Sequence, residues 1–237
     1  MLPPRDEDLY VVWRPPFPEP RLDPAETALL VVDMQYRDAH PEGALFEQIR
    51  AAGFGEQLEY YRDRLGLIVP NIRRLQDAFR AASAEVIHLR IQSLTQDGRD
   101  RGVSHKKLGH AGAPGSRDAE FLPELQPVGD EIVINKTAGS PFISTNIAYV
   151  LRNLGIRTLV VTGVVTTGCV LTTVTDAADS GFHVVLVEDA CAALVPEMHW
   201  GAIRIMRDVY AKILTTDAVA ARLESCAAHG VDQERSR

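Results

Sequence analysis

Apolar runs that alternate with helical patterns constrain the fold of this chain more than any other feature. The apolar runs span 27–35, 85–91, 131–137, 157–163, 183–189 and 211–216. The run at 27–35 is continuous up to Asp33, and such runs suit strands that are buried on both faces, as in parallel sheets. Helical patterns occupy 68–83, 144–155, 169–180, 199–209 and 218–230. The alternation predicts right-handed crossovers and a three-layer α-β-α fold around a six-stranded parallel sheet.

Composition limits the classes of protein to consider. The 237 residues are 46% hydrophobic, which is enough for one sizeable α/β core. A proline-rich N-terminal arm over 1–26 and a single domain over 27–237 are expected. The net charge of −7 argues against nucleic-acid binding. No apolar run approaches the roughly 20 residues of a membrane span, and the N-terminus does not resemble a signal peptide. We therefore expect a cytoplasmic protein without membrane or nucleic-acid partners.

Two long segments follow the first two predicted strands. They cover residues 36–66 and 92–130. In an open α/β sheet, long connections after strands usually build or cover a site. Both segments are therefore expected beside a ligand.

Three chemically capable side chains lie at the ends of predicted strands. Asp33 ends the first strand, Lys136 ends the third, and Cys169 lies just beyond the fourth. With strand order 3-2-1-4-5-6, the first and fourth strands are neighbours, and ligands bind beyond their carboxyl ends. Each residue also has a simpler interpretation when taken singly. Asp33 could cap a loop, Lys136 could be a solvated surface charge, and Cys169 could be a small buried residue of the core. Their shared strand end favours a joint catalytic role.

The chemistry of a thiol explains this grouping. A thiol with an ordinary pKa is mostly protonated at neutral pH, and a helix N-terminus, an ammonium and a carboxylate all favour the thiolate. For amide hydrolysis, Asp33 would take the proton while Cys169 attacks the carbonyl, and water would hydrolyse the thioester. Lys136 would keep Asp33 ionised. Backbone N–H groups of the stretch "GVVTTGCV" would stabilise the oxyanion.

The motifs "LLVVDMQ", "NKT" and "TGVVTTGCV" stand in an order that resembles the isochorismatase-like cysteine hydrolases. This resemblance runs from about residue 25 to 217. It implies a six-stranded parallel sheet in the order 3-2-1-4-5-6 and an Asp33–Lys136–Cys169 triad. It also implies a cis peptide between Val164 and Val165, with the backbone amides of Val165 and Cys169 forming the oxyanion hole.

The resemblance also narrows the branch of the family. The region "HLRIQSLTQDGRD" lacks the Asp-x-His of the nicotinamidase metal site, so no metal and no cofactor are expected. Cys169 favours amide cleavage over the ether hydrolysis of true isochorismatases. The segment "PGSRDAEFLPELQPVGDEIVINKTAGSPFISTN" is similar to the ureidoacrylate and biuret type. We therefore expect a small ureido or carbamoyl substrate, release of ammonia or an amine, and a homo-oligomer (dimer or tetramer). The alternatives are an isochorismatase-type ether hydrolase and a nicotinamidase-like amidase.

Five further residues are expected to line the substrate pocket: Gln35, Tyr36, Arg90, Phe142 and His199. Arg90 is a candidate for binding a substrate carboxylate, with a salt bridge at a strand end as the alternative. For Phe142 the alternative is ordinary packing, and for His199 it is a satisfied core histidine.

Predictions also follow for one histidine and two cysteines outside these motifs. His105 belongs either to a solvated loop or to a lid over the site. Cys191 and Cys226 are expected to be structural or inert.

Overall fold

The computed structural model describes residues 9–13, 17–109 and 111–234. Its centre is a six-stranded sheet in the order β3-β2-β1-β4-β5-β6, and all its strand pairs are parallel. The strands are β1 (Thr27–Val32), β2 (Glu85–Ile91), β3 (Ile132–Lys136), β4 (Thr158–Val164), β5 (His183–Ala192) and β6 (Lys212–Leu214). The predicted fold and strand order are confirmed.

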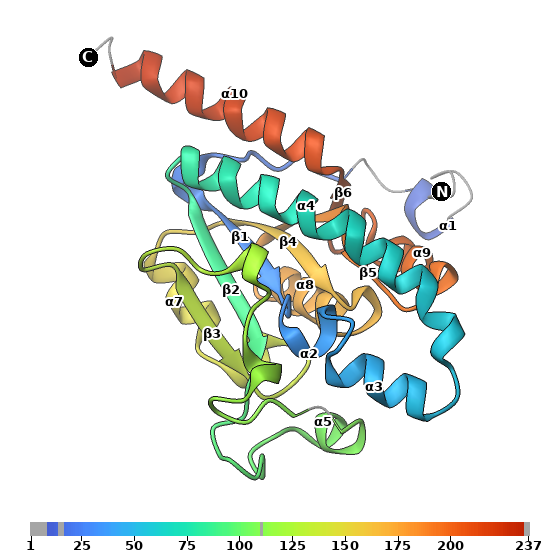
Figure 1. Cartoon of the computed structure of the whole chain (residues 1–237). Coiled ribbons are helices and arrows are strands. Elements are labelled where there is room, and N and C mark those ends of the chain that lie inside the picture. Colours follow the sequence, from blue (N-terminus) through green and yellow to red (C-terminus); the bar gives the residue numbers. More distant parts are fainter. Residues whose placement is uncertain (1–8, 14–16, 110, 235–237) are drawn as a thin grey trace.

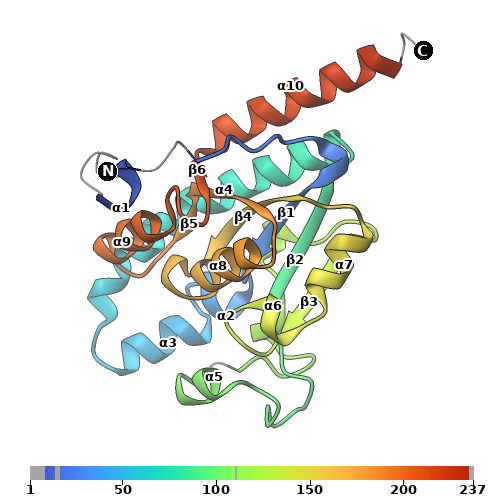
Figure 2. The same ribbon diagram turned by 180° about the vertical axis from the view of Figure 1, so that it is seen from behind.

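Helices cover both faces of the sheet. One face carries α4 (Glu59–Ala81) and α10 (Thr216–Glu234), as Figure 1 shows. The view from behind in Figure 2 shows α7 (Ile147–Asn153), α8 (Leu171–Asp179) and α9 (Pro196–Met206) on the other face. The shorter helices are α1 (Leu9–Val12), α2 (Tyr36–Ala39), α3 (Ala44–Ala51), α5 (Val103–Lys107) and α6 (Pro141–Ser144). Within the described ranges, no helix has the length and hydropathy needed to span a membrane.

Helix α4 begins nine residues earlier than the start of the predicted helix at residue 68. Tyr61 and Leu65 extend its buried stripe one turn at a time toward the N-terminus, and both side chains pack into the core. The helix continues through Pro70, which lies inside it. Burial of this longer apolar stripe stabilises the extra turns.

The two long segments differ in character. Residues 36–66 are largely helical, because they hold α2, α3 and the first turns of α4. Residues 92–130 hold α5 and short 3-10 turns at Arg117–Ala119 and Pro123–Leu125. The Gly102 amide donates to the Thr137 carbonyl at 2.9 Å, which ties the start of α5 to the end of β3. The α5 segment therefore lies at the carboxyl edge of the sheet, as Figure 1 shows.

The predicted N-terminal arm over 1–26 lies partly outside the described residues, which omit 1–8 and 14–16. Its described part packs on the same chain. Glu19 forms ion pairs of 2.6 Å with Lys212 and with Arg222, and Leu22 is buried in the core. These contacts join residues 17–23 to β6 and α10.

A partly buried ionic cluster links β2, α4 and the turn before β3. Glu131 accepts hydrogen bonds from Arg80 Nε (2.7 Å) and Nη2 (3.0 Å) and from the Val128 amide (2.9 Å), and it contacts His88 Nε2 at 2.8 Å. Burial alone would raise the pKa of the Glu131 carboxyl, but these partners outweigh burial and lower it to about 2.

Replacing Glu131 by Gln is expected to lower the free energy of unfolding by about 1–3 kcal/mol at pH 7. Because the folded-state pKa lies below the unfolded value, this stability is present above about pH 5 and is lost as the pH falls toward 2. Urea unfolding at several pH values would measure it. Glu124→Gln, an exposed neighbour, is the matched control. An equal acid dependence in wild type and Glu131→Gln would contradict the assignment.

Candidate active site

The structure brings the three predicted strand-end residues into contact. Lys136 Nζ lies 2.8 Å from Asp33 Oδ2 and 3.2 Å from Cys169 Sγ. Their exposed fractions are 0% for Lys136, 1% for Asp33 and 7% for Cys169. A cation thus bridges a carboxylate and a thiol in a buried site at the carboxyl edge of the sheet.

The topology explains why a lysine occupies the bridging position. Strands β1 and β4 are neighbours, so Asp33 and the segment after β4 start close together, whereas β2 separates β3 from β1. The long stem of Lys136 carries its ammonium toward the other two side chains. Asp33 itself adopts a positive φ of 51°, a conformation that Asp tolerates better than most residues.

Cys169 lies in a short π-helical turn, Thr166–Val170, which leads into α8. The peptide bond between Val164 and Val165 is cis. The Val165 carbonyl accepts hydrogen bonds from the amides of Gly168 (2.9 Å) and Val170 (3.3 Å). The Thr173 hydroxyl donates to the Cys169 carbonyl at 2.5 Å. These bonds fix the turn and hold Cys169 at the head of α8.

The electrostatics of the thiol differ from the sequence expectation. Burial and the charge of Asp33 raise the pKa of the Cys169 thiol well above its usual range, and Lys136 only partly opposes them. Burial would lower the pKa of Lys136, but Asp33 and Cys169 raise it overall. This direction is opposite to the lowered thiol pKa expected from the neighbouring charges, and it favours a neutral thiol beside an ammonium in the resting site. Such a thiol needs a base at the moment of attack.

Gln35, predicted to line the pocket, is engaged with the backbone. Its Nε2 donates to the carbonyls of Ile91 (3.1 Å) and Asp118 (2.7 Å), and its Oε1 accepts from the Ile91 amide (2.7 Å). It joins the end of β2 to the 3-10 turn Arg117–Ala119. The geometry gives Gln35 a supporting position beside the site.

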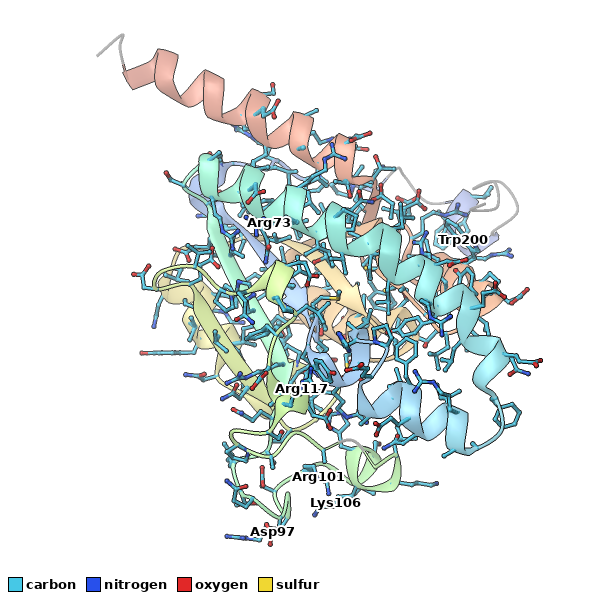
Figure 3. All side chains as sticks on the ribbon, viewed as in Figure 1. Arg73, Asp97, Arg101, Lys106, Arg117 and Trp200 are labelled. Carbon is cyan, nitrogen blue, oxygen red and sulfur yellow. The ribbon has the colours of Figure 1, made fainter. Side chains whose placement is uncertain are left out.

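Tyr36 begins α2, and its hydroxyl donates to Glu42 Oε2 at 2.7 Å. The Arg117 guanidinium lies 4.0 Å from the centre of its ring, and Figure 3 labels Arg117 in this region. Arg90 uses Nε, Nη1 and Nη2 on Asn135, on the Ala119 carbonyl and on Gln92. The Arg90 guanidinium is therefore satisfied by protein groups.

Phe142 packs on Phe182, with their ring centres 5.9 Å apart. Phe142 also packs against the core cluster that includes Cys169 and Val170, so the contacts of Phe142 are apolar packing contacts. His199 is fully buried, and its Nδ1 lies 2.9 Å from the Thr166 hydroxyl in that turn. Its Nε2 lies 3.3 Å from Arg64 Nη2. His199 thus supports the Cys169 turn from behind.

A buried charged pair on α2, shortly after β1, was not predicted from the sequence. Arg37 is fully buried, and its Nη1 contacts Asp38 Oδ1. The Tyr61 hydroxyl donates to the Asp38 carbonyl at 2.9 Å. Burial raises the pKa of the Asp38 carboxyl to about 6, although Arg37 opposes this. An Arg-Asp dipeptide one residue after "VVDMQ" was the signal available in the sequence.

His105 on α5 joins the same region. It is buried, which rules out the solvated-loop alternative. Burial, followed by the charges of Lys136 and Arg37, lowers the pKa of His105 to about 4. Figure 3 labels Arg101 and Lys106, which flank His105 on this segment. The α5 segment therefore packs over the Lys136 side of the site.

Among the residues that the structure describes, no group of three or more His, Cys, Asp or Glu side chains is arranged to hold a metal ion.

The fold and the site together define an α/β protein with a buried Asp–Lys–Cys group at the carboxyl edge of a parallel sheet. The family model described as the isochorismatase domain matches residues 27–218. The chain therefore belongs to the isochorismatase family.

Named relatives and solved structures agree with this placement. Ureidoacrylate amidohydrolase RutB of Rhizobium rhizogenes is 32% identical over 213 residues, which cover 78% of each chain. N-carbamoylsarcosine amidase of an Arthrobacter species is 28% identical over 163 residues, covering 67% of this chain and 62% of that relative. The crystal structure of a cysteine hydrolase from Pseudomonas syringae pv. phaseolicola matches with a TM-score of 0.78 at 28% identity, covering 90% of this chain and 99% of that chain.

Proposed function

We propose that this protein is a cysteine-dependent hydrolase that cleaves a carbon–nitrogen bond of a small amide, ureido or carbamoyl compound. The observation that carries the proposal is the contact of one buried ammonium with both Asp33 and Cys169, at 2.8 Å and 3.2 Å. A general base and a nucleophile placed together are what acyl transfer requires.

In the first half-reaction, Asp33 takes the proton of the Cys169 thiol as Sγ attacks the carbonyl carbon. The raised pKa of the thiol supports this order, because it disfavours a free thiolate before attack. Backbone amides of Val165 and Cys169 donate to the oxyanion. Asp33 then gives the proton to the leaving nitrogen, the C–N bond breaks, and ammonia or an amine leaves behind a thioester.

In the second half-reaction, Asp33 removes a proton from water as its oxygen attacks the thioester carbonyl. The C–S bond breaks, and Asp33 returns the proton to Sγ. The acid product leaves and the thiol is restored. Lys136 keeps its positive charge throughout, which stabilises the Asp33 carboxylate and the sulfur as negative charge moves between them.

The ureido or carbamoyl substrate class is supported by the named relatives. Two of them are called ureidoacrylate amidohydrolase and N-carbamoylsarcosine amidase, and both names describe cleavage of such a group. Homo-oligomeric assembly and a cytoplasmic location stay predictions from the sequence.

The test is ammonia release from biuret, ureidoacrylate, N-carbamoyl amino acids, nicotinamide and simple amides. Release from at least one ureido or carbamoyl compound is expected, with a loss of roughly 10³-fold or more in Cys169→Ala. Cys191→Ala is the matched control, because Cys191 is also buried but lies in β5 and is not used in the mechanism.

Each contrary outcome has a distinct meaning. Activity that survives Cys169→Ala would rule out the thiol as nucleophile and favour an ether hydrolase or another water-attack mechanism. If the wild type releases no ammonia from any of the compounds, the proposed substrate class is contradicted. Loss of activity in folded Cys191→Ala would show that the mechanism assigns the wrong cysteine.

A further inference from the structure

Arg37 is an unusual residue to find wholly inside a protein. Its side chain is 0% exposed, and only its Nη1 has a partner, Asp38. Its Nε and Nη2 are buried without a hydrogen-bond acceptor among the described residues. Buried donors without acceptors cost free energy, and buried charges are normally paired more fully than this. Two unused donors on a buried cation therefore indicate a place for a ligand.

The two unused atoms define the shape of that ligand. In a guanidinium, Nε–H and one Nη2–H point in the same direction along one edge, while Nη1 lies on the opposite side. That edge matches the two oxygens of a carboxylate through parallel charge-assisted hydrogen bonds. Asp38 already occupies the Nη1 side, so the edge formed by Nε and Nη2 is left open for an incoming anion.

Arg37 lies in the electrostatic neighbourhood of the catalytic group. Arg37 lies four residues after Asp33, in the single turn of α2. The ionisation of its partner Asp38 responds to Asp33 and Lys136, and that of Tyr61 responds to Asp33, Arg37 and Cys169 together. A carboxylate held by Arg37 would therefore lie in the same buried region as Asp33, at the start of α2.

We infer that the Nε/Nη2 edge of Arg37 binds the carboxylate of the substrate. The substrate is then a carboxylic acid that also carries the carbamoyl or ureido group to be cleaved. The inference rests on the proposed function for the cleavage step, but the carboxylate site itself requires only that Cys169 be reachable by small molecules.

Two further observations favour Arg37 over the sequence candidate Arg90. Each of the three nitrogens of the Arg90 guanidinium already donates to a protein acceptor, on Asn135, Ala119 and Gln92. In addition, the Asp38 carboxyl beside Arg37 has a pKa raised to about 6. Asp38 can therefore take up a proton near neutral pH when a second anion arrives, which limits the repulsion between the two carboxylates.

The first test compares two alkylating reagents of nearly equal size, iodoacetate and iodoacetamide, on Cys169. The measured quantity is the alkylation rate with iodoacetate divided by the rate with iodoacetamide, each first corrected for the reagent's rate with glutathione. A high ratio reports attraction of a carboxylate to the site. We expect Arg37→Gln to lower this ratio roughly tenfold or more. Arg73→Gln, on the exposed face of α4, is the control for loss of one positive charge. Arg90→Gln tests the competing site.

The second test uses hydrolysis. N-carbamoyl-β-alanine and its methyl ester differ in the carboxylate alone. In Arg37→Gln, kcat/KM for the acid is expected to fall roughly tenfold or more relative to the ester. Arg37→Lys keeps the charge but not the two-donor edge, so it should lose much of the same preference. This variant also decides the question if Arg37→Gln does not fold.

The outcomes separate this inference from the proposed function. Both ratios unchanged within twofold in Arg37→Gln or Arg37→Lys would overturn the carboxylate site. A loss of preference in Arg90→Gln, with none in the Arg37 variants, would also overturn it and assign the carboxylate to Arg90. If neither compound is hydrolysed by the wild type, the cleavage proposal fails for this pair. The alkylation ratio then decides the carboxylate site alone.

Discussion

Replacing Asp33 by Asn is expected to reduce the rate of C–N cleavage by roughly 10³-fold or more. Asn has nearly the same shape as Asp but cannot accept the thiol proton. Because the pKa of the Cys169 thiol is raised by burial and by Asp33, little thiolate forms without a base. Steady-state ammonia release measures the effect, and Asp77→Asn on the exposed face of α4 is the matched control.

The pH profile of the variant gives a readout that a structural role of Asp33 would not produce. Without the carboxylate, the thiol must lose its proton to solvent, so the residual rate should rise about tenfold per pH unit through the neutral range. The wild-type rate should be flatter over the same range, because Asp33 removes the proton within the site. Parallel profiles for wild type and Asp33→Asn would contradict the role of Asp33 as base.

Folding must be separated from chemistry in this experiment. Asp33→Asn leaves the Lys136 ammonium buried without its carboxylate, and breaking a buried ion pair from one side typically costs about 3–5 kcal/mol. The double variant Asp33→Asn, Lys136→Met removes both charges and should recover much of the lost stability. It should remain inactive. A double variant that regains activity along with stability would show that the triad matters for folding and not for catalysis.

The fold could be predicted from the sequence because its strands are buried on both faces. All six residues of β1 are buried, and this burial appears directly as the run "TALLVV". Asp33 and Lys136 are charged residues at the ends of such runs. For this reason they could also be predicted as members of the candidate triad. Periodicity carries no comparable signal for single helical turns, so α1, α2 and α5 did not emerge from it.

The interior of the site could not be predicted in the same way. Arg37 and Asp38 are charged, so their sequence suggests a solvated turn, yet Tyr61 on α4 covers Asp38, and both charges are buried. Their burial depends on long-range packing that no local pattern encodes. The raised pKa of the Cys169 thiol was not expected for the same reason. The sequence shows the neighbouring charges but not how completely water is excluded from the site.

Gly163→Ala is expected to have the largest effect on stability of any single methyl addition in the described sheet. Gly163 ends the ladder between β4 and β1, where it pairs with Val32, and its φ is +112°. A Cβ at this position would lie 2.0 Å from the Val32 carbonyl oxygen, a contact that only movement of the β1 backbone can relieve. Because Asp33 directly follows Val32, that movement would displace the proposed base as well.

The magnitude follows from two costs that add at this position. The left-handed conformation alone costs an alanine about 1–3 kcal/mol, and the clash with backbone in a close-packed sheet adds about 1–3 kcal/mol or more. Gly181→Ala, with φ +90° and open space around its Cβ position, isolates the first cost. Gly201→Ala, within α9 and also in open space, has neither cost and should be neutral or slightly stabilising.

Thermal and urea unfolding of the three variants would rank them. The expected order of stability is Gly201→Ala above Gly181→Ala, with Gly163→Ala far below both or not recovered as folded protein. Equal stability of Gly163→Ala and Gly181→Ala would show that β1 moves aside at little cost. If that variant were also as active as the wild type, the close approach of β4 to β1 at Gly163 would not be what positions Asp33 against Lys136 and Cys169.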